Sequence, residues 1–113
     1  MLTNRDDIIL ILGIKKYIEY HFMESLTIDD LCKKAAINSD KFKAGFHQVV
    51  GISPHSFIQQ LRINEARSLL STTQKSIKAI CLETGYKSKT SFDKTFKKLC
   101  GNTPLEYRKQ FEK

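Results

Sequence analysis

The chain has 113 residues, of which 41% are hydrophobic and 27% are charged, and its formal net charge is +7. This length and composition predict one domain or two small subdomains, with a core that forms without a metal or a disulfide. Three cysteines, an odd number, and the lack of a recognisable secretory signal argue against a disulfide-stapled secreted protein and favour the reducing cytoplasm.

The first predicted helix starts at Asn4, whose spacing from Asp7 resembles a capping arrangement, and ends near Phe22. The apolar run from Ile8 to Leu12 gives this helix more apolar surface than one face can bury, although the run is too short to span a membrane. One interpretation is a core helix with a frayed start, and the other is contact with a neighbouring subunit or an absent domain. The residues at helical spacing on its inner face are Ile11, Ile14, Ile18 and Phe22.

Two later stretches share one pattern. The stretch from Thr27 to Phe57 and the stretch from Ser76 to Tyr107 align with an offset of 49 residues and then of 50, so the second copy has one extra residue in its turn. Each copy reads as a short helix, a tight turn and a second helix, closed by Gly and then Ser-Pro or Thr-Pro. This is the sequence form of a helix-turn-helix, present twice. The aligned pairs include Ile28 with Ile77, Cys32 with Cys81, Phe42 with Phe92, Phe46 with Phe96 and Pro54 with Pro104.

In the first copy, Thr27 caps the first helix, and the turn at residues 36–38 lacks the glycine that the second copy has. The second helix is predicted from Ser39 to Val50. Its inward side chains are Phe42, Phe46 and Val49, and its outward side chains are Asp40, Ala44 and His47. This outward stripe attracts phosphate weakly, because it consists of an acid, a methyl group and a mostly neutral imidazole.

A long connecting helix follows the first copy. Ser53 and Pro54 form a strong helix start, and the helix is predicted to run to Leu70, where a polar linker begins. Its buried residues are expected to be Phe57, Ile58, Leu61, Ala66, Leu69 and Leu70. The predicted division is an N-terminal helix with the first subdomain at 1–53, a linker helix at 54–71, and a second subdomain with a closing helix at 72–113. The fold class is all-α with about seven helices.

In the second copy, Ser76 and Ser88 cap the two helices and Gly85 supplies the positive φ of the turn. The inward stripe of the second helix is predicted to be Phe92, Phe96 and Leu99. Its outward positions are Thr90, Lys94 and Lys97, with Asp93 and Lys98 on either side of this stripe. Lys87 and Lys89 lie at the N-terminal end of the helix.

This second helix concentrates positive charge. Residues 87–98 hold five lysines and one aspartate. Residues 1–53 hold seven basic and seven acidic residues, whereas residues 54–113 hold twelve and five, so the whole excess lies in the second half. Net charge alone does not choose between nucleic acid and an anionic membrane, and a lysine-rich helix face is often only solvated. A helix-turn-helix with its positive charge on the outward stripe favours DNA.

The same residues carry a family resemblance. The runs Ile80 to Tyr86, Ser91 to Lys98 and Gly101 to Arg108 resemble the signature of the AraC/XylS transcription regulators, and Gly51 to Leu70 resembles the linker helix of that family. The resemblance covers about Leu26 to Phe111. It implies two homeodomain-like helix-turn-helix subdomains joined by a long helix, which bind double-stranded promoter DNA in the major groove and often contact RNA polymerase.

The resemblance also implies which residues meet DNA, on recognition helices at about 39–50 and 88–100. These are Ser39, Asp40, Lys43 and Ala44 on the first helix and Lys89, Thr90, Ser91, Asp93 and Lys94 on the second. The family commonly has arginine at the positions of Ala44 and Lys94 and glycine at that of Ala36. Family members usually carry a sensor domain elsewhere, so the chain is expected to be a stand-alone regulator or the DNA-binding end of a longer protein with a sensor or dimerisation domain.

Other classes of function have less support. No paired carboxylates, nucleophile with base or phosphate loop point to an enzyme, and no cofactor is expected. His21, His47 and His55 are scattered, and no zinc-ligand spacing is present, so no metal site is predicted. Cys32 and Cys81 are expected to be packing residues. The alternative function is a helical protein-interaction module that docks through the Ile8 to Leu12 run, with DNA binding lost or non-specific.

Overall fold

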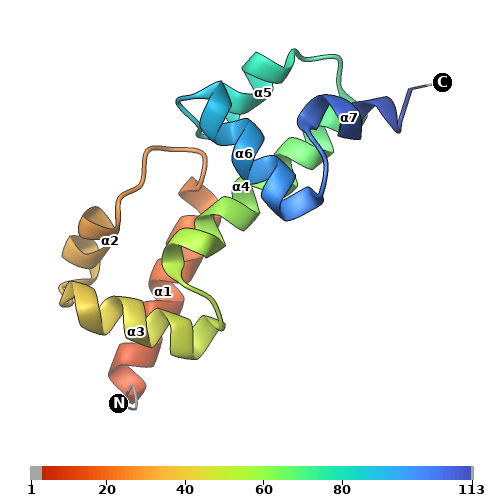
Figure 1. The fold of residues 1–113 in the computed structure, drawn as a ribbon. Helices are drawn as coiled ribbons and strands as arrows, with labels where there is room; N and C mark the ends of the chain where they lie inside the picture. Colours follow the sequence, from red (N-terminus) through yellow and green to blue (C-terminus); the bar gives the residue numbers. More distant parts are fainter. Residues whose placement is uncertain (1–3, 113) are drawn as a thin grey trace. The chain divides into compact units, whose positions relative to one another are not determined.

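The computed structural model describes residues 4–112, and this range forms seven helices and no strand, which confirms the predicted all-α class (Figure 1). The helices are α1 (Arg5–His21), α2 (Ile28–Ala35), α3 (Ser39–Val50), α4 (Pro54–Thr72), α5 (Ile77–Glu83), α6 (Lys89–Cys100) and α7 (Pro104–Lys109). The chain divides into two compact units, residues 1–58 and 59–113, and α4 runs from the first into the second. None of the helices within residues 4–112 combines the length and the apolar character needed to cross a lipid bilayer.

In the first unit, α1, α2 and α3 pack against one another in every pairing (Figure 1). The predicted start of α1 is confirmed, because Oδ1 of Asn4 accepts a hydrogen bond from the backbone N–H of Asp7 at 2.9 Å. Asp7 is itself buried and forms an ion pair of 3.1 Å with Lys41 of α3. The buried apolar side chains of this unit are Ile11, Ile14, Ile18, Leu31, Cys32, Ala35, Phe42, Phe46 and Ile58.

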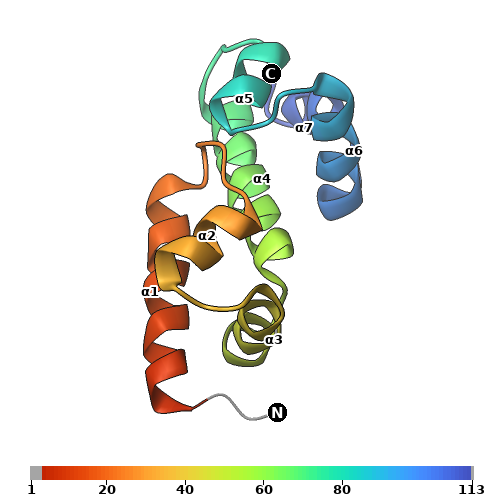
Figure 2. The ribbon, with the colours of Figure 1, turned by 90° about the vertical axis from the view of Figure 1, so that its left-hand side faces the viewer.

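In the second unit, α6 contacts both α5 and α7 (Figure 2). Its core is a cluster made of Ile63, Ala66, Leu70, Ile80, Cys81, Tyr86, Phe92 and Phe96. The ring of Phe96 meets the ring of Tyr107 edge-on at 5.6 Å between centroids, so the closing helix α7 covers the inner face of α6. The side chains of α4 that take part in the cluster come from its second half.

The two helix-turn-helix turns use the same backbone conformation at aligned positions. Gly85 has a φ of 99°, and Ala36 has a φ of 52°. Both angles lie in the left-handed region that glycine adopts freely and that an L-residue with a Cβ adopts at a cost. In the second turn the buried hydroxyl of Thr84 donates to the carbonyl of Ile80 at 2.8 Å, which adds a second hydrogen bond to a carbonyl that already accepts from the backbone N–H of Thr84.

Several predicted details differ from the structure. Leu99 was expected in the core but is 42% exposed, because it lines a surface hollow together with Ile63 of α4, which is buried and was not predicted. The helix α4 continues to Thr72, two residues past its predicted end, where the hydroxyl of Thr72 donates to the carbonyl of Ser68 at 2.7 Å. The side chains expected to be buried but found half-buried are Val49, Phe57, Leu61 and Leu69.

Candidate nucleic-acid interface

The structure holds α6 firmly by one face and leaves the other face open. Ser88 caps the helix by accepting a hydrogen bond from the N–H of Ser91 at 3.3 Å, and Gly101 ends it with a φ of 85°. Phe92 and Phe96 are fully buried, and their rings lie 5.9 Å apart. Because these two rings fix the rotation of α6 about its axis, the residues on the opposite side are displayed to solvent.

The predicted contact residues of α6 share this open face. The exposed ones are Lys87, Lys89, Thr90, Ser91, Lys94, Lys97 and Lys98. Asp93 is the partly covered member, with a side chain that is 34% exposed and paired with Lys89. Lys89 and Asp93 are thus engaged with each other, the remaining residues are open to a ligand, and whether any of them touches DNA stays a prediction.

The charge at the start of α6 opposes the stability of the helix. Its first turn contains no acidic residue, although a helix N-terminus is stabilised by negative charge. By contrast, α1, α2 and α3 each place at least one aspartate in the first turn. Lys87 thus stands at a positive helix end without a carboxylate in that turn, an arrangement that suits a phosphate supplied from outside, whereas Lys89 is paired with Asp93 of the next turn.

On α3, the predicted contact residues also lie away from the core. Asp40, Lys43, Ala44 and His47 are exposed, and Ser39 is half-buried. Asn38 caps this helix with hydrogen bonds from the N–H groups of Asp40 and Lys41 at 2.8 and 3.2 Å. Since the ammonium of Lys41 is engaged by Asp7, Lys43 is the lysine that α3 presents away from that ion pair. The face of α3 is accordingly much less positive than that of α6.

A layer of aromatic and cationic side chains supports the turn before α6. The ring of Tyr86 lies 5.4 Å from that of Phe92, and the guanidinium carbon of Arg62 lies 5.6 Å from the centroid of the Tyr86 ring. Burial raises the pKa of the Tyr86 phenol, although the Arg62 charge opposes the shift. Tyr86 therefore stays neutral at ordinary pH and serves to position the helix.

The cysteines have structural surroundings, as expected. Cys32 and Cys81 are buried, and Cys81 donates to the backbone carbonyl of Tyr86 at 3.8 Å. Burial raises the pKa of all three thiols, including that of the partly exposed Cys100. No group of His, Cys, Asp or Glu side chains among residues 4–112 is arranged to hold a metal ion.

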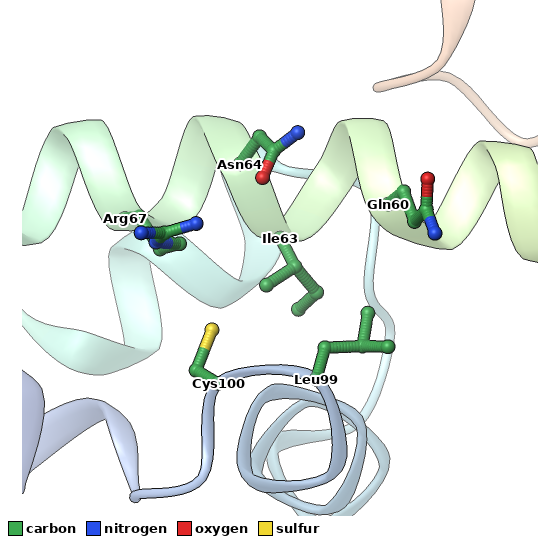
Figure 3. A pocket seen from close by; sticks show the side chains of 6 residues that line it. All are labelled: Gln60, Ile63, Asn64, Arg67, Leu99 and Cys100. Atoms are coloured by element: carbon green, nitrogen blue, oxygen red, sulfur yellow. The ribbon is translucent and has the colours of Figure 1, made fainter.

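A hollow of about 200 Å³ lies between α4 and the end of α6 (Figure 3). Ile63 points into the space between Leu99 and Cys100, and Arg67 lies over the far end. Burial raises the pKa of Cys100 while the Arg67 charge lowers it. Four of the residues that line it, Gln60, Asn64, Arg67 and Leu99, are exposed, so the hollow is open to solvent.

Sequence reasoning missed one feature of the α6 face, which is the ion pair between Lys89 and Asp93. Nζ of Lys89 lies 2.8 Å from Oδ2 of Asp93. The spacing of four residues on a predicted helix was a readable signal, because side chains at i and i+4 are neighbours on a helix surface. The pair means that two predicted contact residues already contact each other in the DNA-free protein.

Residues 31–110 match the family model described as a helix-turn-helix domain. The melibiose operon regulatory protein of Escherichia coli (strain K12) is 36% identical over 93 residues, which are 82% of this chain and 31% of that protein. The transcriptional regulator YisR of Bacillus subtilis (strain 168), described as uncharacterized and HTH-type, is 34% identical over 94 residues, 83% of this chain and 33% of that protein. The chain therefore spans about a third of the length of these curated relatives.

Solved structures have the same fold. A probable AraC family transcriptional regulator from Rhodopseudomonas palustris CGA009 superimposes with a TM-score of 0.81 at 25% identity, over 92% of this chain and 98% of that one. The DNA-binding domain of the global transcriptional factor AdpA, solved in complex with a target DNA, gives a TM-score of 0.85 at 21% identity, over 89% and 91% of the two chains. At 21% identity the second likeness shows the fold alone.

Proposed function

The chain belongs to the AraC family of helix-turn-helix transcription regulators, and we propose that it binds double-stranded promoter DNA sequence-specifically to regulate transcription. The observation that carries this proposal is the open face of α6. Five lysines lie within twelve residues, on and just before a helix whose other side is held by Phe92 and Phe96. Such a face fits the major groove in shape and the phosphates in charge.

In this proposal the two recognition helices contribute unequally. Lys87, Lys94, Lys97 and Lys98 supply most of the phosphate neutralisation, while Thr90 and Ser91 lie where base edges are read. On α3, Asp40 accepts from a base amino group, Ala44 meets a thymine methyl group, and Ser39, Lys43 and His47 flank them. The helix α6 is thus the main source of affinity, and α3 adds sequence preference with little attraction for phosphate.

The proposed domain boundaries follow the two copies of the helix-turn-helix repeat. The first helix-turn-helix subdomain, with α1, occupies residues 1–53, the linker helix 54–71 joins it to the second, and residues 72–113 form the second subdomain with the closing helix α7. Both subdomains present one recognition helix, so the proposed binding site on DNA is bipartite. Boxes about one helical turn apart are what two such helices reach on one face of DNA.

We also propose that α1 contacts a protein partner. Ile9, Leu10 and Leu12 are between 41% and 59% exposed, and contiguous exposed apolar side chains are typical of interaction surfaces. The curated relatives are about three times as long as the matched region, so a sensor or dimerisation domain is the partner that we propose for this surface, with RNA polymerase as a second partner of the DNA-bound protein. The proposed location is the cytoplasm, where bacterial promoters are.

The experiment that tests the function is selection of bound duplexes from a random DNA pool at near-physiological salt, followed by sequencing. Two enriched boxes about one turn apart are expected if both helices read DNA. A single box would limit sequence reading to one helix. If no motif is enriched, sequence-specific binding by this chain is wrong, and the protein-interaction module is the better description.

A further inference from the structure

We propose that Asp93 is a specificity-determining residue of α6. It forms an ion pair with the ammonium of Lys89 and so reduces the attraction of that ammonium to DNA phosphates, which are the same in every sequence. This inference rests on the proposed DNA-binding function. It assigns to Asp93 a role that differs from direct base contact, since Asp93 acts through Lys89. The consequence is weaker binding to non-target DNA and a larger ratio between target and non-target affinity.

The geometry of the pair is the first support. Nζ of Lys89 and Oδ2 of Asp93 are 2.8 Å apart, and the side chains are 58% and 34% exposed. The lysine is therefore open to solvent at the start of α6, and its charge is already compensated. Within residues 4–112, the other lysines of this stretch form no ion pair, and these are Lys87, Lys94, Lys97 and Lys98. Lys89 is thus distinguished from its neighbours by having an internal partner.

The second support comes from the other carboxylate oxygen. Oδ1 of Asp93 is buried and has no hydrogen-bond partner within the described part of the chain. A carboxylate with one oxygen shut off from water is poorly compensated, so it depends strongly on the cation that it does hold. Lys89 and Asp93 also line a hollow with Ile77, Thr103, Pro104 and Leu105, so one side of the pair faces mostly apolar side chains. The pair is consequently more persistent than a fully solvated ion pair.

Helix stability does not account for the pair. Lys89 is the first residue of α6, where a cation opposes the helix dipole, and an acid placed four residues after a lysine is the less favourable of the two orientations. In this proposal the lysine at that position serves to meet an external ligand. Asp93 controls when it does so.

On binding non-target DNA, Lys89 would exchange the Asp93 carboxylate for a DNA phosphate. When non-target DNA approaches, Lys89 can reach a phosphate only by leaving the Asp93 carboxylate, so little is gained from the exchange. At a target sequence the lysine can instead donate to a guanine edge in the major groove, an interaction that non-target DNA does not offer at that position. Asp93 therefore suppresses the sequence-independent part of binding while leaving the sequence-dependent part in place.

The test compares Asp93→Asn, Lys89→Gln and the double variant with the wild-type chain. Affinity for a random-sequence duplex is measured by fluorescence anisotropy over a range of salt concentrations, and folding is checked by circular dichroism. For Asp93→Asn we expect severalfold tighter binding to random duplex and a salt slope steeper by about 0.9, the value for one added phosphate contact. In the Lys89→Gln background the same substitution should leave the slope unchanged.

The chain supplies a matched control in Lys15 and Glu19 of α1. This pair has the same order and spacing of lysine and acid, with 3.3 Å between Nζ and Oε2. Glu19→Gln also removes one negative charge, but it lies outside the proposed interface, so it should not steepen the slope. An equal effect of Glu19→Gln and Asp93→Asn would overturn the proposal, because the change in net charge alone would then explain the tighter binding. An effect of Asp93→Asn that persists without Lys89 would overturn it as well.

A second readout uses a duplex enriched by the pool selection. Asp93→Asn should lower the ratio of target to random-duplex affinity relative to wild type, and an unchanged ratio would contradict the proposal. An unchanged ratio would contradict only the role of Asp93. The proposed function would instead be contradicted if the wild-type chain enriched no sequence at all. The random-duplex slopes test the Lys89 and Asp93 pair in either case.

Discussion

Arg108 of α7 donates from Nε to the backbone carbonyl of Leu70 at 3.2 Å, across 38 residues of sequence, and from Nη2 to the carbonyl of Thr73 at 3.3 Å. Both carbonyls belong to the end of α4, where the helix leaves acceptors without intrahelical partners. One guanidinium thus closes α4 and fastens α7 to it. Because Tyr107 of the same short helix packs on Phe96, this attachment also supports the inner face of α6.

Arg108→Ala is expected to lower the free energy of unfolding by about 1 to 3 kcal/mol, since two partly buried carbonyls lose a charged donor. Arg108→Lys should recover only part of this loss, because an ammonium lacks the planar fork that serves two acceptors at once. Urea denaturation followed by circular dichroism measures both. Lys109→Ala, at the exposed neighbouring position of α7, is the control and should change stability little. Equal effects at 108 and 109 would contradict the capping role.

The turn between α2 and α3 stores strain at Ala36, whose φ is 52°. Ala36→Gly is expected to stabilise the protein by about 1 kcal/mol, because relief of the left-handed alanine outweighs the greater freedom of glycine in the unfolded chain. Thermal denaturation gives the comparison. Ala44→Gly, in the right-handed backbone of α3, should instead destabilise by about 1 kcal/mol. Loss of stability in both variants would show that the turn is unstrained.

Local signals account for most of what the sequence predicted of the fold. Asn4, Thr27, Ser76 and Ser88 each accept a first-turn N–H as predicted, because capping depends on residues within three positions. The long-range attachment by Arg108 has no such local signal. Alanine is also not a signal for a positive φ, so the conformation of Ala36 was not predicted.

The candidate site was predictable to the extent that helical periodicity determines it. The burial of Phe92 and Phe96 sets which residues of α6 face outward, and the periodicity gives those positions correctly. Burial periodicity alone does not give the pairing of Lys89 with Asp93, which follows from a separate signal, their spacing of four residues on one helix. It also failed at Leu99, where the end of the helix meets Ile63 from a distant part of the sequence.

Lys94→Ala should weaken DNA binding more than Ala44→Ser. Lys94 is exposed on the middle of α6, so its removal takes away a phosphate contact and reduces the salt slope by about 0.9. Ala44→Ser keeps charge and size nearly constant on the less positive α3. A DNA titration at several salt concentrations makes the comparison. Small and equal effects would reject the assignment of α6 as the main source of affinity.

Thiol reactivity should report the packing around α6. Burial raises the pKa of Cys32, Cys81 and Cys100, so the reactive thiolate is scarcer at neutral pH than in the unfolded chain. As the pH rises, alkylation should begin at the partly exposed Cys100, with the other two thiols reacting only after unfolding. Mass spectrometry of native and urea-unfolded protein resolves the sites. Fast native labelling of Cys81 would contradict the buried position found for it.

Ala44→Arg tests whether α3 faces DNA at all. The position is exposed in the middle of α3, so the substitution supplies the long, forked donor that this helix lacks. If α3 lies in a major groove, the variant should bind DNA more tightly and select a guanine at one position of its box, because arginine donates to O6 and N7 of guanine. Gln110→Arg, at the exposed end of α7, adds the same charge on a different helix and should tighten binding without selecting a new base. Pool selection with both variants separates the outcomes. A new guanine preference for Ala44→Arg alone would place α3 against base edges, whereas the same motif for both variants would mean that the first recognition helix does not read DNA.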